Sequence, residues 1–140
     1  MKRFFLVFLS VLLILSGIST ASARTFTSIS MLQQFIMNNS PEKISAAGEQ
    51  YVDLSGVILE IRYTGQSNHY EMTLQIDDPK GMIPLEYDSP VLIVHFRLHV
   101  DPIPFELGET VDVFGSLNTL YSSVMYPLIL ARTINGTEDF

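Results

Sequence analysis

The stretch Tyr51-Val-Asp-Leu-Ser-Gly-Val-Ile-Leu-Glu-Ile-Arg62 decides the fold, because it predicts one long strand with a glycine in its middle. Val52 and Leu54 lie on one side of such a strand and polar residues on the other, the pattern of a half-buried strand. Gly56 takes the next inward position, and the inward series then slips by one residue before Ile61. A glycine and a slip inside one strand indicate a β-bulge or a sharp bend. We therefore expect this strand to coil around a small closed barrel.

Four further strands are expected along the rest of the chain. They are predicted over residues 70–77, 91–100, 109–117 and 126–134, from alternating or β-branched runs separated by turn residues. Gly115 takes an inward position in its strand, as Gly56 does in the first. Five strands with no alternating helices predict a mainly β fold, a five-stranded Greek-key barrel.

Two short helices are expected before the barrel. Residues 24–28 read as a polar lead-in, and the first helix follows, because apolar residues recur at spacings of three and four as far as Asn38. Ser40 then caps a second helix that has Pro41 at its first position and stops at Gly48. We expect the two helices to cap one end of the barrel.

The first residues of the chain have the pattern of an export signal. Lys2 and Arg3 precede an almost continuous apolar run over residues 4–18, shorter than the roughly 20 residues that a membrane span needs. Small residues at positions 21 and 23 then predict cleavage after Ala23, and hence a periplasmic or secreted protein. An uncleaved segment would instead anchor the chain to a membrane. The expected division is signal peptide 1–23, helical segment 24–50, barrel 51–135 and tail 136–140.

The composition excludes several classes of chemistry. The chain has no cysteine, which removes disulfides, thiol catalysis and thiolate metal sites. Once Lys2 and Arg3 leave with the signal, six of the eight basic residues remain against fifteen acidic ones, a net charge of −9. Because nucleic-acid binding depends on basic side chains that displace phosphate counterions, this balance argues against a general DNA or RNA binder.

The order of the strand motifs resembles an OB-fold. The motifs are Val52-x-Leu54-x-Gly56-x-Ile58, Leu74-x-Ile76, Val94-x-Phe96 and Leu107-Gly108-x-x-Val111-x-Val113-x-Gly115. The leading Met31-Leu32, Asn38-Asn39, Ala46 and Tyr51 resemble the exported tRNA_anti-like branch of bacterial OB-fold proteins, and the bacterial OB-fold (BOF) family is a neighbouring possibility. The resemblance covers nearly the whole mature chain and implies a binding module.

No set of residues in the sequence predicts catalysis. The three histidines have no cysteine partner, and no G-x-S-x-G context marks a nucleophilic serine. His95 and His99 share one face of a predicted strand, but four residues of strand span about 13 Å, too far for one metal ion. Arg97 lies between them and would repel a metal. We therefore expect a non-enzymatic protein without a metal or cofactor.

The outward side of the second and third strands is the candidate binding surface, since OB-folds bind oligonucleotides or oligosaccharides there and in the adjoining loops. A solvated polar face is the alternative. The candidate residues are His95, Arg97, His99, Thr73, Gln75, Tyr63, His69 and Tyr121.

Three functions follow from this surface. The first is a binding module for a small ligand, glycan or envelope polymer, anionic or carbohydrate in character. The second is a protein-interaction or oligomerisation domain that uses Phe114, Ile93 or the barrel edge, with its oligomeric state left open. A single-stranded nucleic-acid binder comes third, because the mature chain is strongly acidic.

Overall fold

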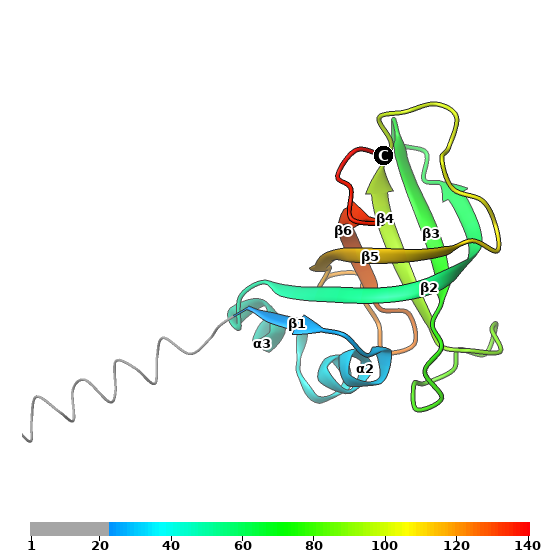
Figure 1. Cartoon of the computed structure of the whole chain (residues 1–140). Helices are drawn as coiled ribbons and strands as arrows, with labels where there is room; N and C mark the ends of the chain where they lie inside the picture. Colours follow the sequence, from blue (N-terminus) through cyan, green and yellow to red (C-terminus); the bar gives the residue numbers. More distant parts are fainter. Residues whose placement is uncertain (1–22) are drawn as a thin grey trace, which may run out of the picture.

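The computed structural model describes residues 23–140, so the predicted signal peptide lies outside the described residues except for Ala23. In chain order the elements are β1 (Arg24–Phe26), α2 (Ile29–Asn38), α3 (Pro41–Ala46), β2 (Gln50–Tyr63), β3 (His69–Gln75), β4 (Val91–Arg97), β5 (Thr110–Leu117) and β6 (Leu128–Ile134). Figure 1 shows β2 and β5 lying across β3, β4 and β6. In this part of the chain, no helix is both long enough and apolar enough to span a bilayer.

Five of the strands close a barrel. The order is β2-β3-β4-β6-β5, and β5 pairs back onto β2. Every pair in this ring is antiparallel except β4 with β6, which run parallel. A five-stranded Greek-key barrel with this crossover is the OB-fold. The predicted fold class is therefore confirmed.

The long strand β2 bends as its glycine and slip predict. Val52, Leu54 and Gly56 are buried, and the pairing with β3 skips one residue after Ile58, which is a bulge. A Cβ atom on Gly56 would lie 2.8 Å from the backbone oxygen of Gln75, so a side chain would push the two strands apart. The bend lets one strand pair with β5 along its first half and with β3 along its second.

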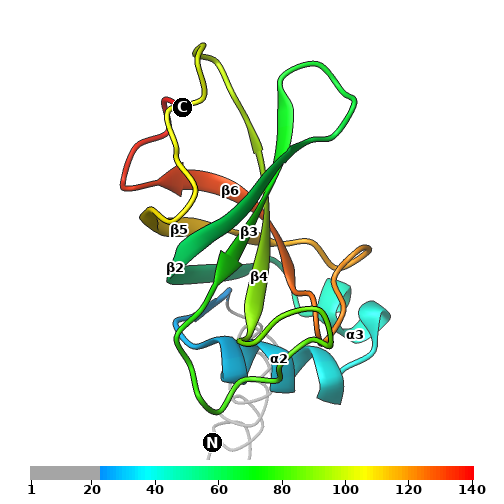
Figure 2. The ribbon, with the colours of Figure 1, turned by 90° about the vertical axis from the view of Figure 1, so that its right-hand side faces the viewer.

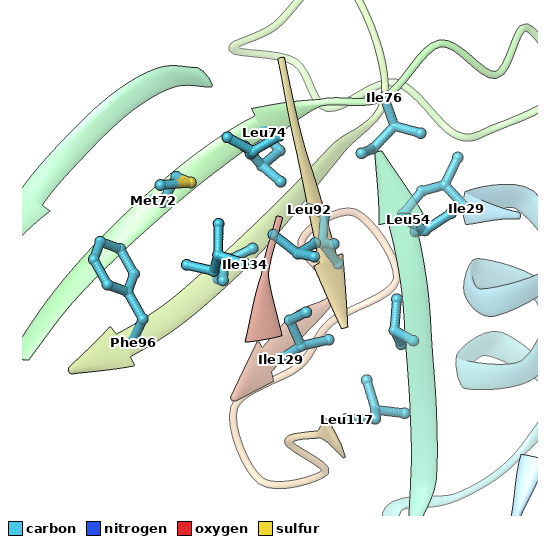
Figure 3. Close-up of a cluster of buried hydrophobic side chains, with 14 of the residues drawn as sticks. Ile29, Leu54, Met72, Leu74, Ile76, Leu92, Phe96, Leu117, Ile129 and Ile134 are labelled. Carbon is cyan, nitrogen blue, oxygen red and sulfur yellow. The ribbon is translucent and has the colours of Figure 1, made fainter. Parts of the chain in front are cut away.

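The core fills the barrel with aliphatic side chains. Met72, Leu74, Leu92, Ile129 and Ile134 are fully buried, and Figure 3 shows them clustered between the strands. The helix α2 adds Ile29 and Leu32, also fully buried, to the same cluster. Figure 2 shows both helices at one end of the barrel, which confirms the expected cap.

The expected polar lead-in over residues 24–28 is wrong. Residues Arg24–Phe26 form β1, which pairs parallel with the start of β2. Phe26 is buried, and its ring centroid lies 5.0 Å from that of Phe35 on α2. Three residues are too few to show an alternating pattern, so the strand is revealed only by its pairing with β2 and the packing of Phe26.

Each of the four later strands is shorter than predicted, and β4 and β6 show the physical reasons. β4 ends at Arg97 rather than at residue 100, because its partner β3 begins at His69, opposite Arg97. Beyond that point the amide of His99 donates to the backbone oxygen of Phe140. β6 begins at Leu128 rather than at residue 126, after Pro127, which has no amide to donate to a ladder.

The end of the chain is packed against the barrel. The side chain of Phe140 is buried, and its ring lies 6.1 Å from Phe96 and 6.5 Å from Phe105 between centroids. These three aromatic rings fill the end of the barrel near the β2–β3 hairpin. Residues 136–140, expected to be a polar tail, therefore contribute an apolar side chain to the core.

Candidate functional site

A cleft of about 510 Å³ opens on the outer surface of the barrel, over β3, β4 and β6. We call it the β4 cleft. One wall is the loop between β2 and β3 (residues 64–68), and the opposite wall is the loop between β5 and β6 (residues 118–127). Figure 2 shows both loops on the same side of β4.

The β2–β3 loop is held by hydrogen bonds at its base. The amide of Thr64 donates to the backbone oxygen of His69 at 3.1 Å, and the amide of His69 donates to that of Gln66 at 3.0 Å. The His69 ring contacts Gln66 again, since its Nδ1 lies 2.9 Å from the side-chain oxygen Oε1. The loop therefore presents a hydroxyl, an amide and an imidazole to the cleft in a defined arrangement.

The β5–β6 loop is ordered from within as well. Oδ1 of Asn118 accepts hydrogen bonds from the backbone amides of Leu120 at 3.0 Å and Tyr121 at 3.2 Å. The hydroxyl of Ser122 donates to the backbone oxygen of Leu128 and accepts its amide. These bonds leave the side chains of Leu120 and Tyr121 82% and 74% exposed. The loop therefore presents the Tyr121 ring to the cleft.

The charges in and beside the cleft are unequally compensated. Glu71 binds Nη2 of Arg62 at 2.5 Å and Nε2 of His95 at 2.8 Å. Because a carboxylate only accepts hydrogen bonds, Nε2 of His95 is the donor in this contact. Arg97 is exposed and forms no ion pair with any residue between 23 and 140. It is therefore the uncompensated positive charge of the cleft.

Four of the eight predicted site residues line this cleft. They are His69, His95, Arg97 and Tyr121. His69 on β3 pairs in register with Arg97 on β4, and Tyr121 comes from the opposite wall. The surface and loops expected from the OB-fold resemblance thus meet around a single depression.

The other four residues lie elsewhere. Thr73 was expected to face outward and be accessible, but it is only 4% exposed, because it lies on a central strand between its register partners Glu60 and Ile93. His99 lies beyond the end of β4, so the prediction that it shares one face of that strand with His95 is wrong.

Gln75 and Tyr63 are also outside the cleft. The side-chain amide of Gln75 donates to the hydroxyl of Ser89 at 3.1 Å. Tyr63 packs its ring 5.5 Å from that of Tyr70, near the end of the hairpin.

Several lining residues were missed by the sequence analysis. They are Thr64, Gln66, Tyr70, Phe96, Asn118, Leu130 and Ala131. Leu130 could have been found, because it is an apolar residue at an outward position of the last strand, directly opposite His95 in register. The polar residues gave no pattern, since loop residues are placed by turn geometry rather than by periodicity.

A second cleft, of about 440 Å³, lies at the start of α2 and is lined by Asp53, Asp77 and Asp78 among others. Asp78 has a structural role there. Its carboxylate accepts hydrogen bonds from the backbone amides of Ser30 and Lys80, both at 3.0 Å. The bond from the Ser30 amide, at the first turn of α2, is the main cause that lowers the pKa of Asp78 below its ordinary value.

Comparison with known proteins adds fold likeness only. No protein-family model matches the chain and no curated protein matches it, so the resemblance to the tRNA_anti-like and BOF families stays a prediction. A Stn1-Ten1 complex of S. pombe is similar to it at 24% identity and a TM-score of 0.42, over 64% of this chain. This chain spans 59% of the length of that one.

Two other solved structures are similar at comparable levels. A "putative nucleic acid-binding lipoprotein" of Klebsiella pneumoniae matches at 22% identity and a TM-score of 0.49, over 80% of this chain and 91% of its own. Yeast Stn1 and Ten1 match at 13% identity and a TM-score of 0.48, over 82% of this chain and 63% of that one. At these values the likenesses carry no functional conclusion for this chain.

Proposed function

We propose that this protein is an exported, non-enzymatic OB-fold binding module whose β4 cleft holds an anionic saccharide of the cell envelope. One observation carries the proposal. Arg97 is the uncompensated cation on the floor of the 510 Å³ cleft, and it lies among hydroxyl, amide and aromatic side chains. Export rests on the pattern of the first 23 residues.

The lining of the cleft suits a sugar that carries a carboxylate. The side-chain oxygens of Gln66 and Asn118 are used within the two loops, so these residues offer their NH2 groups as donors to sugar hydroxyls. The exposed ring of Tyr121 offers a flat apolar surface, and an aromatic face can stack on a ring without reading a sequence. The guanidinium of Arg97 can fork onto a carboxylate with two hydrogen bonds.

The same cleft is poorly suited to a nucleic acid. A nucleic-acid strand carries one phosphate per nucleotide, and proteins that bind such strands have several lysines or arginines along a groove. Arg97 is the one lysine or arginine among the lining residues, and the mature chain has a net charge of −9 with six basic side chains. We therefore favour a ligand with sparse charge over a polyphosphate.

The test is a calorimetric titration of residues 24–140 with oligogalacturonate, with a neutral galactose oligomer and with an oligodeoxythymidine as comparisons. We expect oligogalacturonate to bind most tightly. Arg97→Ala should weaken it at least tenfold, about 1.4 kcal/mol. Lys80→Ala is the matched control, because it removes one exposed positive charge outside the cleft. Tighter binding of the oligonucleotide, or equal loss in both variants, would contradict the proposal.

A further inference from the structure

A second surface lies on the outer side of β2 and β5, which face the viewer in Figure 1. Its residues alternate along the two strands as cross-strand pairs, Tyr51 with Ser116, Asp53 with Phe114 and Ser55 with Asp112. We call these six residues the β2–β5 face. None of them lines the β4 cleft. Four are polar, as expected for an outward face, so the two aromatic residues require an explanation.

The aromatic pair is fixed in one arrangement. The rings of Tyr51 and Phe114 stack with centroids 5.4 Å apart and planes 16° apart. The guanidinium of Arg132 lies 4.9 Å from the Tyr51 centroid, a cation–π contact. Glu49 holds both partners, since it binds Nη2 of Arg132 at 2.7 Å and accepts the Tyr51 hydroxyl at 2.6 Å. A surface held in this way loses little conformational freedom on binding.

The backbone of β6 is shaped to place Arg132. Thr133 pairs with Phe114 and Ala131 pairs with Gly115, so Arg132 is the extra residue of a bulge. Bulges re-aim side chains next to functional sites. The bulge needs Gly115, because a Cβ atom there would lie 2.2 Å from the backbone oxygen of Leu130. β6 thus departs from regular pairing at the residue whose guanidinium lies over the Tyr51 ring.

The charge around the rings is negative. Asp53 and Asp112 are exposed and form no ion pair with any residue in the described part of the chain. Arg132 and Glu49 neutralise each other. A second copy of the chain would bring further carboxylates to the same place, and like charges across an interface are unfavourable. A cationic partner is therefore the complementary one.

We propose that the β2–β5 face docks a protein segment that presents an apolar side chain flanked by lysine or arginine. The apolar side chain would cover the rings of Tyr51 and Phe114, since buried aromatic residues carry much of the energy of such contacts. The basic residues would pair with Asp53 and Asp112 at the rim. The docking proposal specifies a surface and a partner for the protein-interaction function predicted from the sequence. It does not depend on what the β4 cleft binds.

The probe is a ten-residue peptide of alternating lysine and leucine, titrated into the ¹⁵N-labelled protein and followed by amide chemical shifts. We expect the largest shifts at Tyr51, Asp53 and Phe114. Phe114→Ser should raise Kd at least tenfold, and Asp53→Asn with Asp112→Asn at least fivefold. The dispersed amide spectrum of each variant shows whether the barrel is retained. The charge-matched control is Glu106→Gln with Glu138→Gln, two exposed carboxylates outside this face.

Four results would overturn the docking proposal. They are the absence of binding at millimolar peptide, equal weakening in the charge-matched control, shifts that centre elsewhere on the barrel, and equal binding of a glutamate–leucine peptide. Equal weakening in the control would show attraction to net charge rather than to this face.

Discussion

Replacing Gly115 by alanine tests how closely the barrel strands are packed. The new Cβ atom would lie 2.2 Å from the backbone oxygen of Leu130, 2.8 Å from its carbonyl carbon and 2.9 Å from the Cα atom of Ala131. All three atoms belong to the backbone, so no side-chain rotation relieves the clash. β6 has to retreat from β5 by on the order of 1 Å to restore ordinary contact distances.

The expected cost has two parts. Overpacking of this kind costs about 1–3 kcal/mol, and each ladder hydrogen bond weakened by the retreat costs about 0.5–1.5 kcal/mol more. With one or two such bonds affected, we expect Gly115→Ala to lower the free energy of unfolding by about 3 kcal/mol. That is a large part of the roughly 5–15 kcal/mol of a typical domain.

The assay is urea unfolding of residues 24–140, followed by circular dichroism. Gly65→Ala is the matched control, because Gly65 has a φ of +88° but nothing within 4 Å of its Cβ position. That variant should lose only the cost of a strained backbone, about 1 kcal/mol. If Gly115→Ala were no more destabilising than Gly65→Ala, the close approach of β5 and β6 would be refuted.

Three further outcomes are expected. Gln33→Ala should lower the free energy of unfolding in urea by about 1–3 kcal/mol, because the buried side-chain amide of Gln33 hydrogen-bonds both the backbone N–H and the backbone oxygen of Met82. Gln34 is exposed, so Gln34→Ala should leave the free energy of unfolding nearly unchanged. Equal effects of the two substitutions would contradict this role of Gln33. Asp78→Asn should destabilise at neutral pH. Hydrogen bonds lower the pKa of Asp78 in the folded protein below 3.8, so the carboxylate's contribution to stability is present above that pH and is lost as the pH falls further. The stabilities of variant and wild type should therefore converge in acid. A constant difference between them down to pH 2 would contradict this role of Asp78. Protein recovered from the cell envelope should have the intact mass of residues 24–140, and a mass that includes Met1–Ala23 would indicate an uncleaved anchor.

The sequence was most informative where one face of a strand is buried. The alternation in β2 and the inward positions of Gly56 and Gly115 follow from the side-chain period alone. The closed barrel was predicted from these two features. The same alternation placed His95 and Arg97 on the outer surface of β4, where the cleft lies.

The remaining features depend on contacts between distant segments. β1 is too short to carry a pattern, and the end of β4 is set by where β3 begins. The burial of Thr73 depends on its neighbours in two other strands. The bulge that aims Arg132 is set by how β6 fits against Gly115, and one strand read alone does not show it.

The most direct test of the central claim is to locate a bound saccharide. The protein, labelled with ¹⁵N and ¹³C, is saturated with oligogalacturonate, and shifts of backbone and side-chain resonances are mapped onto the barrel. We expect the largest changes at the Arg97 guanidinium Nε–H, the Asn118 amide and the Tyr121 ring, three groups from β4 and the β5–β6 loop that line one cleft. Changes centred on the β2–β5 face, or an unmoved Arg97 at saturation, would contradict the claim that the β4 cleft is the binding site.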